Sequence, residues 1–305
     1  MIFNICFAAM ALHLAARASL PELVCPSSVL VPEAMLNAKV ILLGEQHGTR
    51  EMPKFATDVA CQLASKGFAV DVGLEIPADE QARIDEYLRS EGTNADVKAL
   101  LDSTFWQRSA DRQDGRSSVA MFGIIEWVRE ARRRGSNFRL FAFDVTSTIT
   151  TDKRSRDEVM AANISARIDH SASDVSLIFA GNYHTMKVSR EGSDMKPMGS
   201  FLHYPRTLAY FLNHDGGTAW QCSSATRCES NDVGKCPASE LAKSQPGNVA
   251  REFPNWARQV KAGYDGHIDI GCVSASPPAN ARQKRVGALM EGMTGSSTIA
   301  FKKSA

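Results

Sequence analysis

The 305-residue sequence has almost no net charge, because 35 lysines and arginines stand against 34 aspartates and glutamates. At a net charge of +1 it lacks the positive field that attracts nucleic acid or an anionic membrane surface, so we expect neither as a partner. Hydrophobic residues make up 44% of the chain and charged residues 23%, which is the usual composition of a globular protein with a substantial core.

Several catalytic motifs are also missing. The sequence contains no Gly-x-Ser-x-Gly nucleophile elbow, no His-Glu-x-x-His zinc helix, no Walker phosphate loop and no Gly-x-Gly-x-x-Gly dinucleotide loop. We therefore expect neither a serine hydrolase nor a dinucleotide-dependent enzyme.

The amino terminus carries an apolar run, residues 2–16, that is too short to be a stable membrane anchor. Ala16 and Ala18 then form a small-x-small cleavage pattern. We predict a signal peptide over residues 1–18 and an exported protein, periplasmic or secreted, with no transmembrane anchor after cleavage. A lipoprotein anchored through Cys25 is the less favoured alternative, because Val24 stands where a small residue is expected.

Cleavage would leave six cysteines, and an even number in an exported chain suggests disulfides. Three of the six, Cys222, Cys228 and Cys236, lie close together in polar sequence, with Cys272 further on. Zinc ligation is the alternative, although no Cys-x-x-Cys spacing occurs. Cys61 falls on the apolar face of an expected helix, where we predict a buried thiol.

The chain alternates between short apolar runs and amphipathic stretches with helical spacing. The apolar runs cover residues 38–43, 68–76, 138–143 and 175–180, and the clearest helical stretches cover 53–66, 117–134 and 156–168. This order predicts an α/β fold with a mainly parallel sheet flanked by helices on both faces. We expect a single domain over residues 19–305, in which the cysteine-containing segment 214–263 is an irregular, disulfide-stapled excursion or a lid. Further strands are expected at 267–273 and 296–301.

Polar residues follow all four apolar runs. Gly44-Glu45-Gln46-His47 comes after the first run and Gly181-Asn182-Tyr183-His184 after the fourth, while Glu75 and Asp144 end the second and third. The carboxyl ends of parallel strands share one edge of the sheet, where such folds bind ligands. Any one of these residues could simply cap a strand or form a salt bridge. Two histidines with several carboxylates at one edge are harder to explain by packing alone.

Imidazole and carboxylate side chains together suit a divalent ion such as manganese, zinc or iron. We predict His47, His184 and Glu75 as its ligands, and His47, Glu75 and Glu45 as the catalytic residues. A bound ion would activate water. Without an ion, His47 would be a general base oriented by a carboxylate. Weaker candidates for contacts with substrate are Asn182, Arg50, Arg116 and Asp144.

These motifs resemble those of a known family. Val40-Ile-Leu-Leu-Gly-Glu-Gln-His47, Leu74-Glu75 and Ala180-Gly-Asn-Tyr-His184 are similar to motifs of the Tiki/ChaN superfamily, to which GumN-like and TraB-like proteins also belong. The stretch from Gly44 to Glu51 resembles the erythromycin esterase motif as well, although that motif has one more residue between Glu and His.

The resemblance implies two different functions. Tiki proteins are metal-dependent proteases that use the paired motifs and a glutamate, and erythromycin esterases hydrolyse with the corresponding His and Glu residues. ChaN-like proteins are instead linked to haem or iron binding at the cell envelope. We therefore expect an exported, metal-dependent hydrolase acting on a peptide or a small ester or amide. The alternatives are a non-catalytic haem- or iron-binding protein, or an interaction module with a degenerate site.

Overall fold

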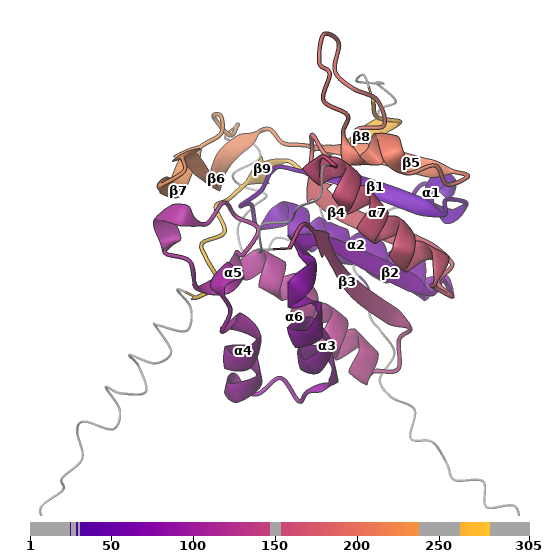
Figure 1. Cartoon of the computed structure of the whole chain (residues 1–305), viewed down its shortest axis with the longest axis horizontal. Helices are drawn as coiled ribbons and strands as arrows, with labels where there is room; N and C mark the ends of the chain where they lie inside the picture. The colour runs from indigo at the N-terminus through magenta and orange to yellow at the C-terminus, as the bar shows by residue number, and fades with distance from the viewer. Residues whose placement is uncertain (1–24, 26–28, 30, 147–153, 238–262, 281–305) are drawn as a thin grey trace, which may run out of the picture.

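A computed structural model describes residues 25, 29, 31–146, 154–237 and 263–280 (Figure 1). Six strands form one sheet in the order β3-β2-β4-β1-β5-β8, and every pair of neighbours runs parallel. The fold is therefore α/β with a parallel sheet, as the sequence pattern predicts. The six strands are β1 (Val40–Glu45), β2 (Val70–Pro77), β3 (Phe138–Asp144), β4 (Val175–Gly181), β5 (Thr207–Asn213) and β8 (Gly266–Asp269).

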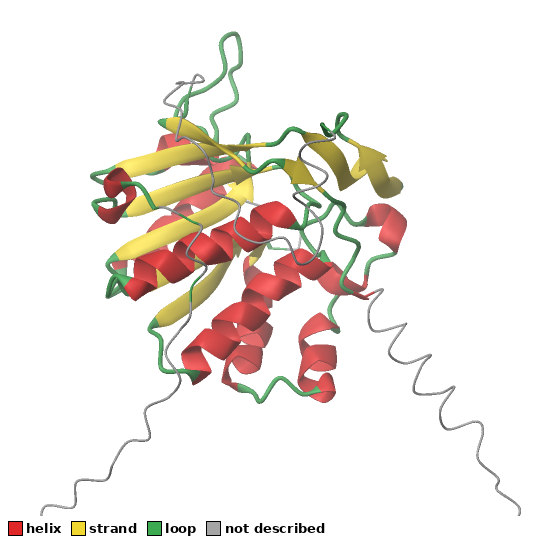
Figure 2. Ribbon diagram, turned by 180° about the vertical axis from the view of Figure 1, so that it is seen from behind, coloured by secondary structure: helices red, strands yellow, loops and turns green. Residues whose placement is uncertain are grey.

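Apolar side chains cover both faces of the sheet. In β1, Ile41 and Leu43 belong to one buried cluster, whereas Val40 and Leu42 belong to another, because successive side chains of a strand point to opposite faces. The first cluster includes the apolar residues of α2 (Glu51–Ser65), α3 (Gln81–Arg89) and α6 (Val119–Arg133), and the second includes those of α7 (Arg156–Asp169). This two-sided burial explains why the strands read as continuous apolar runs rather than alternating ones. Figure 2 shows the helices on the two sides of the sheet.

Shorter helices complete the connections between strands. The segment between α3 and α6 holds α4 (Asn94–Leu101), α5 (Thr104–Gln107) and the 3₁₀ turn η2 (Ala110–Arg112). The others are α1 (Glu33–Leu36), η1 (Ala78–Glu80) and η3 (Met198–Phe201). Serine side chains cap the amino-terminal ends of two helices that border the sheet. The Ser118 hydroxyl accepts a hydrogen bond from the Met121 N–H at the start of α6, and the Ser155 hydroxyl accepts one from the Glu158 N–H at the start of α7.

A second, three-stranded sheet has the order β7-β6-β9 (Figure 1). Its strands are β6 (Gly216–Ser224), β7 (Arg227–Asp232) and β9 (Cys272–Val273). The segment 214–263, expected to be irregular, therefore contains a regular antiparallel hairpin. Most side chains of β7 are exposed and polar, so the hairpin leaves no apolar pattern in the sequence. β5 was not predicted either, although Leu208–Leu212 is apolar.

Three disulfides join described cysteines: Cys222–Cys228, Cys236–Cys272 and Cys25–Cys61. The first two confirm the preference for disulfides over zinc in the cysteine-rich segment. The third shows that the prediction of a free thiol at Cys61 is wrong. The fold brings Cys25 against α2, the helix that carries Cys61. In the described part of the chain, no helix is long and apolar enough to cross a membrane. The expected signal peptide and the expected strand 296–301 lie outside the described residues.

Candidate functional site

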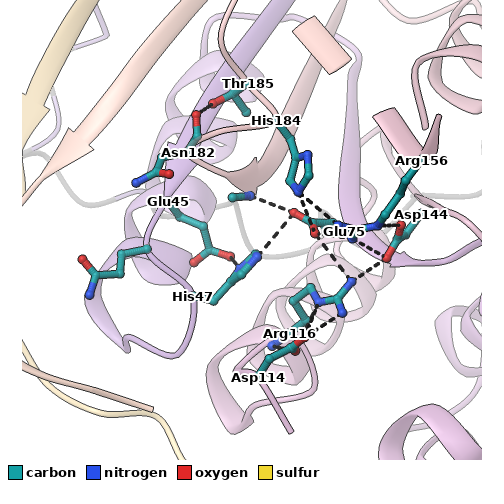
Figure 3. A network of polar contacts seen from close by, with 12 residues as sticks. Glu45, His47, Glu75, Asp114, Arg116, Asp144, Arg156, Asn182, His184 and Thr185 are labelled. Atoms are coloured by element: carbon teal, nitrogen blue, oxygen red, sulfur yellow. Dashed lines mark hydrogen bonds and ion pairs between the residues drawn. The ribbon is translucent and has the colours of Figure 1, made fainter. Parts of the chain in front are cut away.

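The four predicted strand ends meet at one edge of the sheet (Figure 3). β4 lies between β1 and β2, with Glu45 level with Gly181 in the register of β1 and β4. Glu75 lies near the end of β2, and Asp144 ends β3 on the next strand outward. The parallel sheet thus brings together residues as far apart in the sequence as Glu45 and Gly181.

His47 is held between two carboxylates. Its Nδ1 lies 2.8 Å from Glu45 Oε1, and its Nε2 lies 3.5 Å from Glu75 Oε2. Both glutamates are almost fully buried, whereas the histidine side chain keeps 23% of its surface exposed. Burial by itself lowers the pKa of His47, but the two carboxylates outweigh it and raise that pKa to about 10. The imidazole is therefore a cation at neutral pH.

His184 has a matching arrangement on the other side of Glu75. Its Nδ1 lies 2.7 Å from Asp157 Oδ1, and its Nε2 lies 3.8 Å from Glu75 Oε1. The same Nε2 is 3.1 Å from Nη1 of Arg156. Because a guanidinium only donates hydrogen bonds, Nε2 accepts, and the proton of this imidazole sits on Nδ1, where it is donated to Asp157.

Glu75 is the centre of the site and carries a firmly held negative charge. Its Oε2 accepts the Gly181 N–H at 2.8 Å, and its Oε1 accepts from Arg156 Nη2 at 2.7 Å. Arg116 Nη1 stands 3.5 Å from the same Oε1. Burial raises the pKa of Glu75, but His47 and Arg116 outweigh it and hold that pKa well below the ordinary value. Glu75 is therefore poorly suited to act as a general base.

The two arginines are fixed by further carboxylates. Arg156 donates to both oxygens of Asp144, and Arg116 donates to Asp144 from Nη1 and to Asp114 from Nε and Nη2. Although burial raises the pKa of Asp114, Arg116 lowers it to about 2. These contacts build a chain of alternating charges behind Glu75 (Figure 3).

The site opens into a pocket of about 580 Å³. Most of the residues that line it carry carboxyl, imidazole or carboxamide groups. The lining consists of Glu45, Gln46, His47, Asp114, Gly181, Asn182, Tyr183, His184, Gln221 and Cys222. Gln221 and Cys222 come from β6, so the second sheet forms one wall of the pocket. A polar lining of this kind suits a polar ligand.

The predicted site residues divide into two groups. Glu45, His47, Glu75, Asp144, His184 and Arg116 share one network, and Asn182 lines the pocket. Arg50 is exposed and donates from Nε to the Ala275 carbonyl, so it holds a neighbouring loop rather than lining the pocket. Asp157, Arg156 and Asp114 also belong to this network but were not among the predicted site residues. Asp157 and Arg156 open helix α7, where a charged pair after a capping serine suggests nothing more than a helix start.

The contacts around Glu75 do not favour the predicted divalent ion. Two guanidinium groups already neutralise this carboxylate, and one of them also faces Nε2 of His184. A divalent cation would stand beside these positive groups and beside protonated His47. Within the described ranges, no group of three or more His, Cys, Asp or Glu side chains is arranged to hold a metal ion. The ligand set His47, His184 and Glu75 therefore does not fit a metal site as the side chains stand.

Gly181 leaves room for the His47 imidazole. A Cβ at this position would lie 3.0 Å from His47 Nε2 and 3.5 Å from Glu75 Oε2. Gly181→Ala is expected to displace the imidazole and to lower kcat/KM of the hydrolysis that the motifs predict by about 10- to 100-fold, since small misplacements of catalytic groups cost this much. The matched control is Gly123→Ala in α6, where no atom lies within 4 Å of the added Cβ. It should leave activity unchanged and raise the unfolding free energy by about 0.5–1 kcal/mol. Equal activity of the two variants would contradict the close approach.

Residues 31–114 match the family model described as haem-binding uptake, Tiki superfamily, ChaN, which confirms the resemblance seen in the motifs. Among solved structures, a succinoglycan biosynthesis protein has a TM-score of 0.57 at 11% identity, covering 80% of this chain and 90% of its own. A Bacillus cereus protein has a TM-score of 0.52 at 14% identity, covering 81% and 91%. A mutant of the erythromycin esterase EreC in its open conformation has a TM-score of 0.52 at 12% identity, covering 80% and 92%. At these identities the likeness is one of fold. No curated protein sequence matches the chain significantly.

Proposed function

We propose that the protein is an exported hydrolase that cleaves an ester or amide bond with two histidines and without a bound metal ion. One observation carries the proposal. Two imidazoles that line one pocket are each fixed through Nδ1 by a carboxylate, and their Nε2 atoms face the two oxygens of Glu75. Such orientation by a third group is typical of catalytic acids and bases.

In this proposal the two histidines have different roles. His47 is protonated, and its Nε2–H is held only loosely by Glu75 at 3.5 Å, so it is the acid that protonates the leaving group. His184 has its proton on Nδ1 and a lone pair on Nε2, so it is the base that takes a proton from water. For that step, water replaces the contact with Arg156, whose side chain is 36% exposed.

The reaction balances within these residues. Water oxygen attacks the carbonyl carbon while its proton passes to His184 Nε2, and the bond to the leaving oxygen or nitrogen breaks as that atom takes the His47 Nε2 proton. The products are a carboxylic acid and an alcohol or amine, and exchange with solvent restores both imidazoles. Glu75 stays ionised and stabilises the positive charge on either histidine.

Removal of metal ions with a chelator distinguishes metal-free hydrolysis from the metal-dependent hydrolysis that the motifs predict. The protein spanning residues 19–305 is stripped with EDTA and screened with p-nitrophenyl esters and fluorogenic peptides, with and without added manganese or zinc. Hydrolysis by the stripped protein that added metal does not change supports the proposal. Hydrolysis that appears only with metal would restore the metallohydrolase, and no hydrolysis under any condition would reject catalysis of these substrates.

The pH dependence checks the role of His47 as the acid. Its pKa is raised to about 10, so the catalytic cation is present at neutral pH and is lost as pH rises through about 10. We expect kcat/KM to fall on the alkaline side with an apparent pKa near this value, because that profile reports groups of the free enzyme. Glu45→Gln removes one of the carboxylates that raise the pKa and should move the alkaline limb to lower pH. If Glu45→Gln does not move the alkaline limb, a group other than His47 causes the loss of activity at high pH.

Export is supported by the three disulfides, since disulfides persist in oxidising compartments. The signal peptide over residues 1–18 remains the sequence-based part of this proposal. Amino-terminal sequencing of the protein recovered from the periplasm or the medium should begin at Ser19.

Haem binding is the second candidate, favoured by the match of residues 31–114 to a haem-binding family. Tyr183 and His184 line the pocket and offer side chains that can bind haem iron. Against it, the rest of the lining is polar, whereas cofactor sites are mostly apolar. Titration with haemin should give a saturable Soret change that Tyr183→Phe or His184→Gln weakens if haem is the ligand. Absence of a change would remove this candidate.

A further inference from the structure

One pocket residue turns away from the two histidines. Gln46 stands between Glu45 and His47 in the first Gly-x-x-His motif, and those two neighbours bond each other. Gln46 instead contacts His214, which follows β5, on the side of β1 away from β4. The distance from His214 Nε2 to Gln46 Oε1 is 2.7 Å. The pocket network therefore continues across β1 to a third histidine, His214.

The contacts of His214 determine which way the Gln46 carboxamide faces. The Gly216 N–H donates to His214 Nδ1 at 3.1 Å, so Nδ1 is an acceptor and the ring hydrogen of neutral His214 is on Nε2. Burial lowers the pKa of His214, which favours this neutral form. Nε2–H must then donate, and its partner on Gln46 must be the carbonyl oxygen. These contacts assign the orientation of the Gln46 amide, with Oε1 toward His214.

The amino group of Gln46 is consequently left as a donor at the pocket. Its backbone is held as well, because the Gln46 N–H contacts Met52 Sδ at 3.2 Å. In the part of the chain that the structure describes, Gln46 Nε2 has no hydrogen-bond partner, and Gln46 lines the pocket. A donor whose orientation is fixed in advance binds an acceptor with little loss of conformational entropy.

We propose that Gln46 Nε2 is a specificity-determining donor for an uncharged acceptor on the ligand, such as a carbonyl oxygen, and that His214 is its positioning residue. Glu45 and Asp114 line the same pocket, and their carboxylates disfavour a further carboxylate as the acceptor beside Gln46. Asn182 and Gln221 add two more neutral carboxamides. The substrate class that follows is a neutral ester or amide with further uncharged polar groups, which rests on the proposed hydrolysis.

Binding can be tested without any catalysis. In ¹⁵N-labelled protein, the ring couplings of His214 should report the Nε2–H tautomer. Titration with N-methylacetamide, a neutral carbonyl probe, should shift the Gln46 side-chain NH₂ signals saturably, whereas acetate should not. The signals are assigned by their loss in Gln46→Ala. The Nδ1–H tautomer, no shift with N-methylacetamide, or an equal shift with acetate would overturn the proposal.

Kinetics then separates binding from chemistry, using a neutral p-nitrophenyl ester. Gln46→Ala is expected to raise KM by about 10-fold with kcat nearly unchanged, which is the loss of one hydrogen bond made equally to ground and transition states. His214→Leu should do the same, and His214→Gln, which restores a donor, should recover most of the loss. An unchanged KM in Gln46→Ala, or no recovery in a folded His214→Gln, would contradict the proposal. If the wild type hydrolyses no ester, hydrolysis is rejected, while the titration still decides the role of Gln46.

Discussion

His47→Gln is expected to lower kcat/KM for the proposed hydrolysis by about 10²- to 10⁴-fold, the usual contribution of a positioned general acid. Glutamine keeps a side-chain amide that can donate a hydrogen bond, but it cannot give up a proton at neutral pH. It also removes the positive charge that lies between Glu45 and Glu75, at 2.8 Å and 3.5 Å. The measurement is kcat and KM at pH 7 on the best ester or peptide found in the screen.

The matched control is His203→Gln, because His203 is exposed and lies outside the network around Glu75. It should retain wild-type activity. Circular dichroism of both variants shows whether the fold is intact, so that lost activity is not confused with lost structure. A folded His47→Gln variant with activity within a few-fold of wild type would reject His47 as the acid.

Arg116→Met is expected to be strongly destabilising, by about 3–5 kcal/mol in the unfolding free energy, because it removes one partner from a buried cluster of charges. Arg116 is only 16% exposed and contacts Asp114, Asp144 and Glu75. Without it, three carboxylates stay close together, and Arg156 is the one arginine of the pair left against Asp144 and Glu75. Urea unfolding of the oxidised protein at pH 7 measures the effect as a shift of the midpoint.

The comparison variant is Arg133→Met. Arg133 also forms an ion pair, with Glu91 at 2.8 Å, but these side chains are 45% and 75% exposed. Water already screens that pair, so its loss should cost less than about 1 kcal/mol. If the two variants lose similar stability, burial does not set the value of these ion pairs, and the charge chain behind Glu75 is not a structural support of the site.

The sequence by itself determined most of the sheet. The apolar runs that became β1, β2, β3 and β4 are continuous because helices cover both faces of the sheet, and that pattern is visible without coordinates. The polar residues after these runs were also visible, and parallel strands place their ends at one edge. The placement of Glu45, His47, Glu75 and His184 around one pocket follows from that rule.

Tertiary structure decided how these side chains are charged and what they can do. Arg116 and Arg156 approach Glu75 from the loop before α6 and from the start of α7, and nothing local in the sequence predicts that two cations meet this carboxylate. Their presence turned an expected metal ligand into a fixed anion. The exposed, polar hairpin β6–β7, the disulfide at Cys61 and the contact of Gln46 with His214 likewise depend on contacts between distant segments. A local pattern records which face of an element is buried, whereas the charge of a buried group depends on neighbours that only the folded chain brings together.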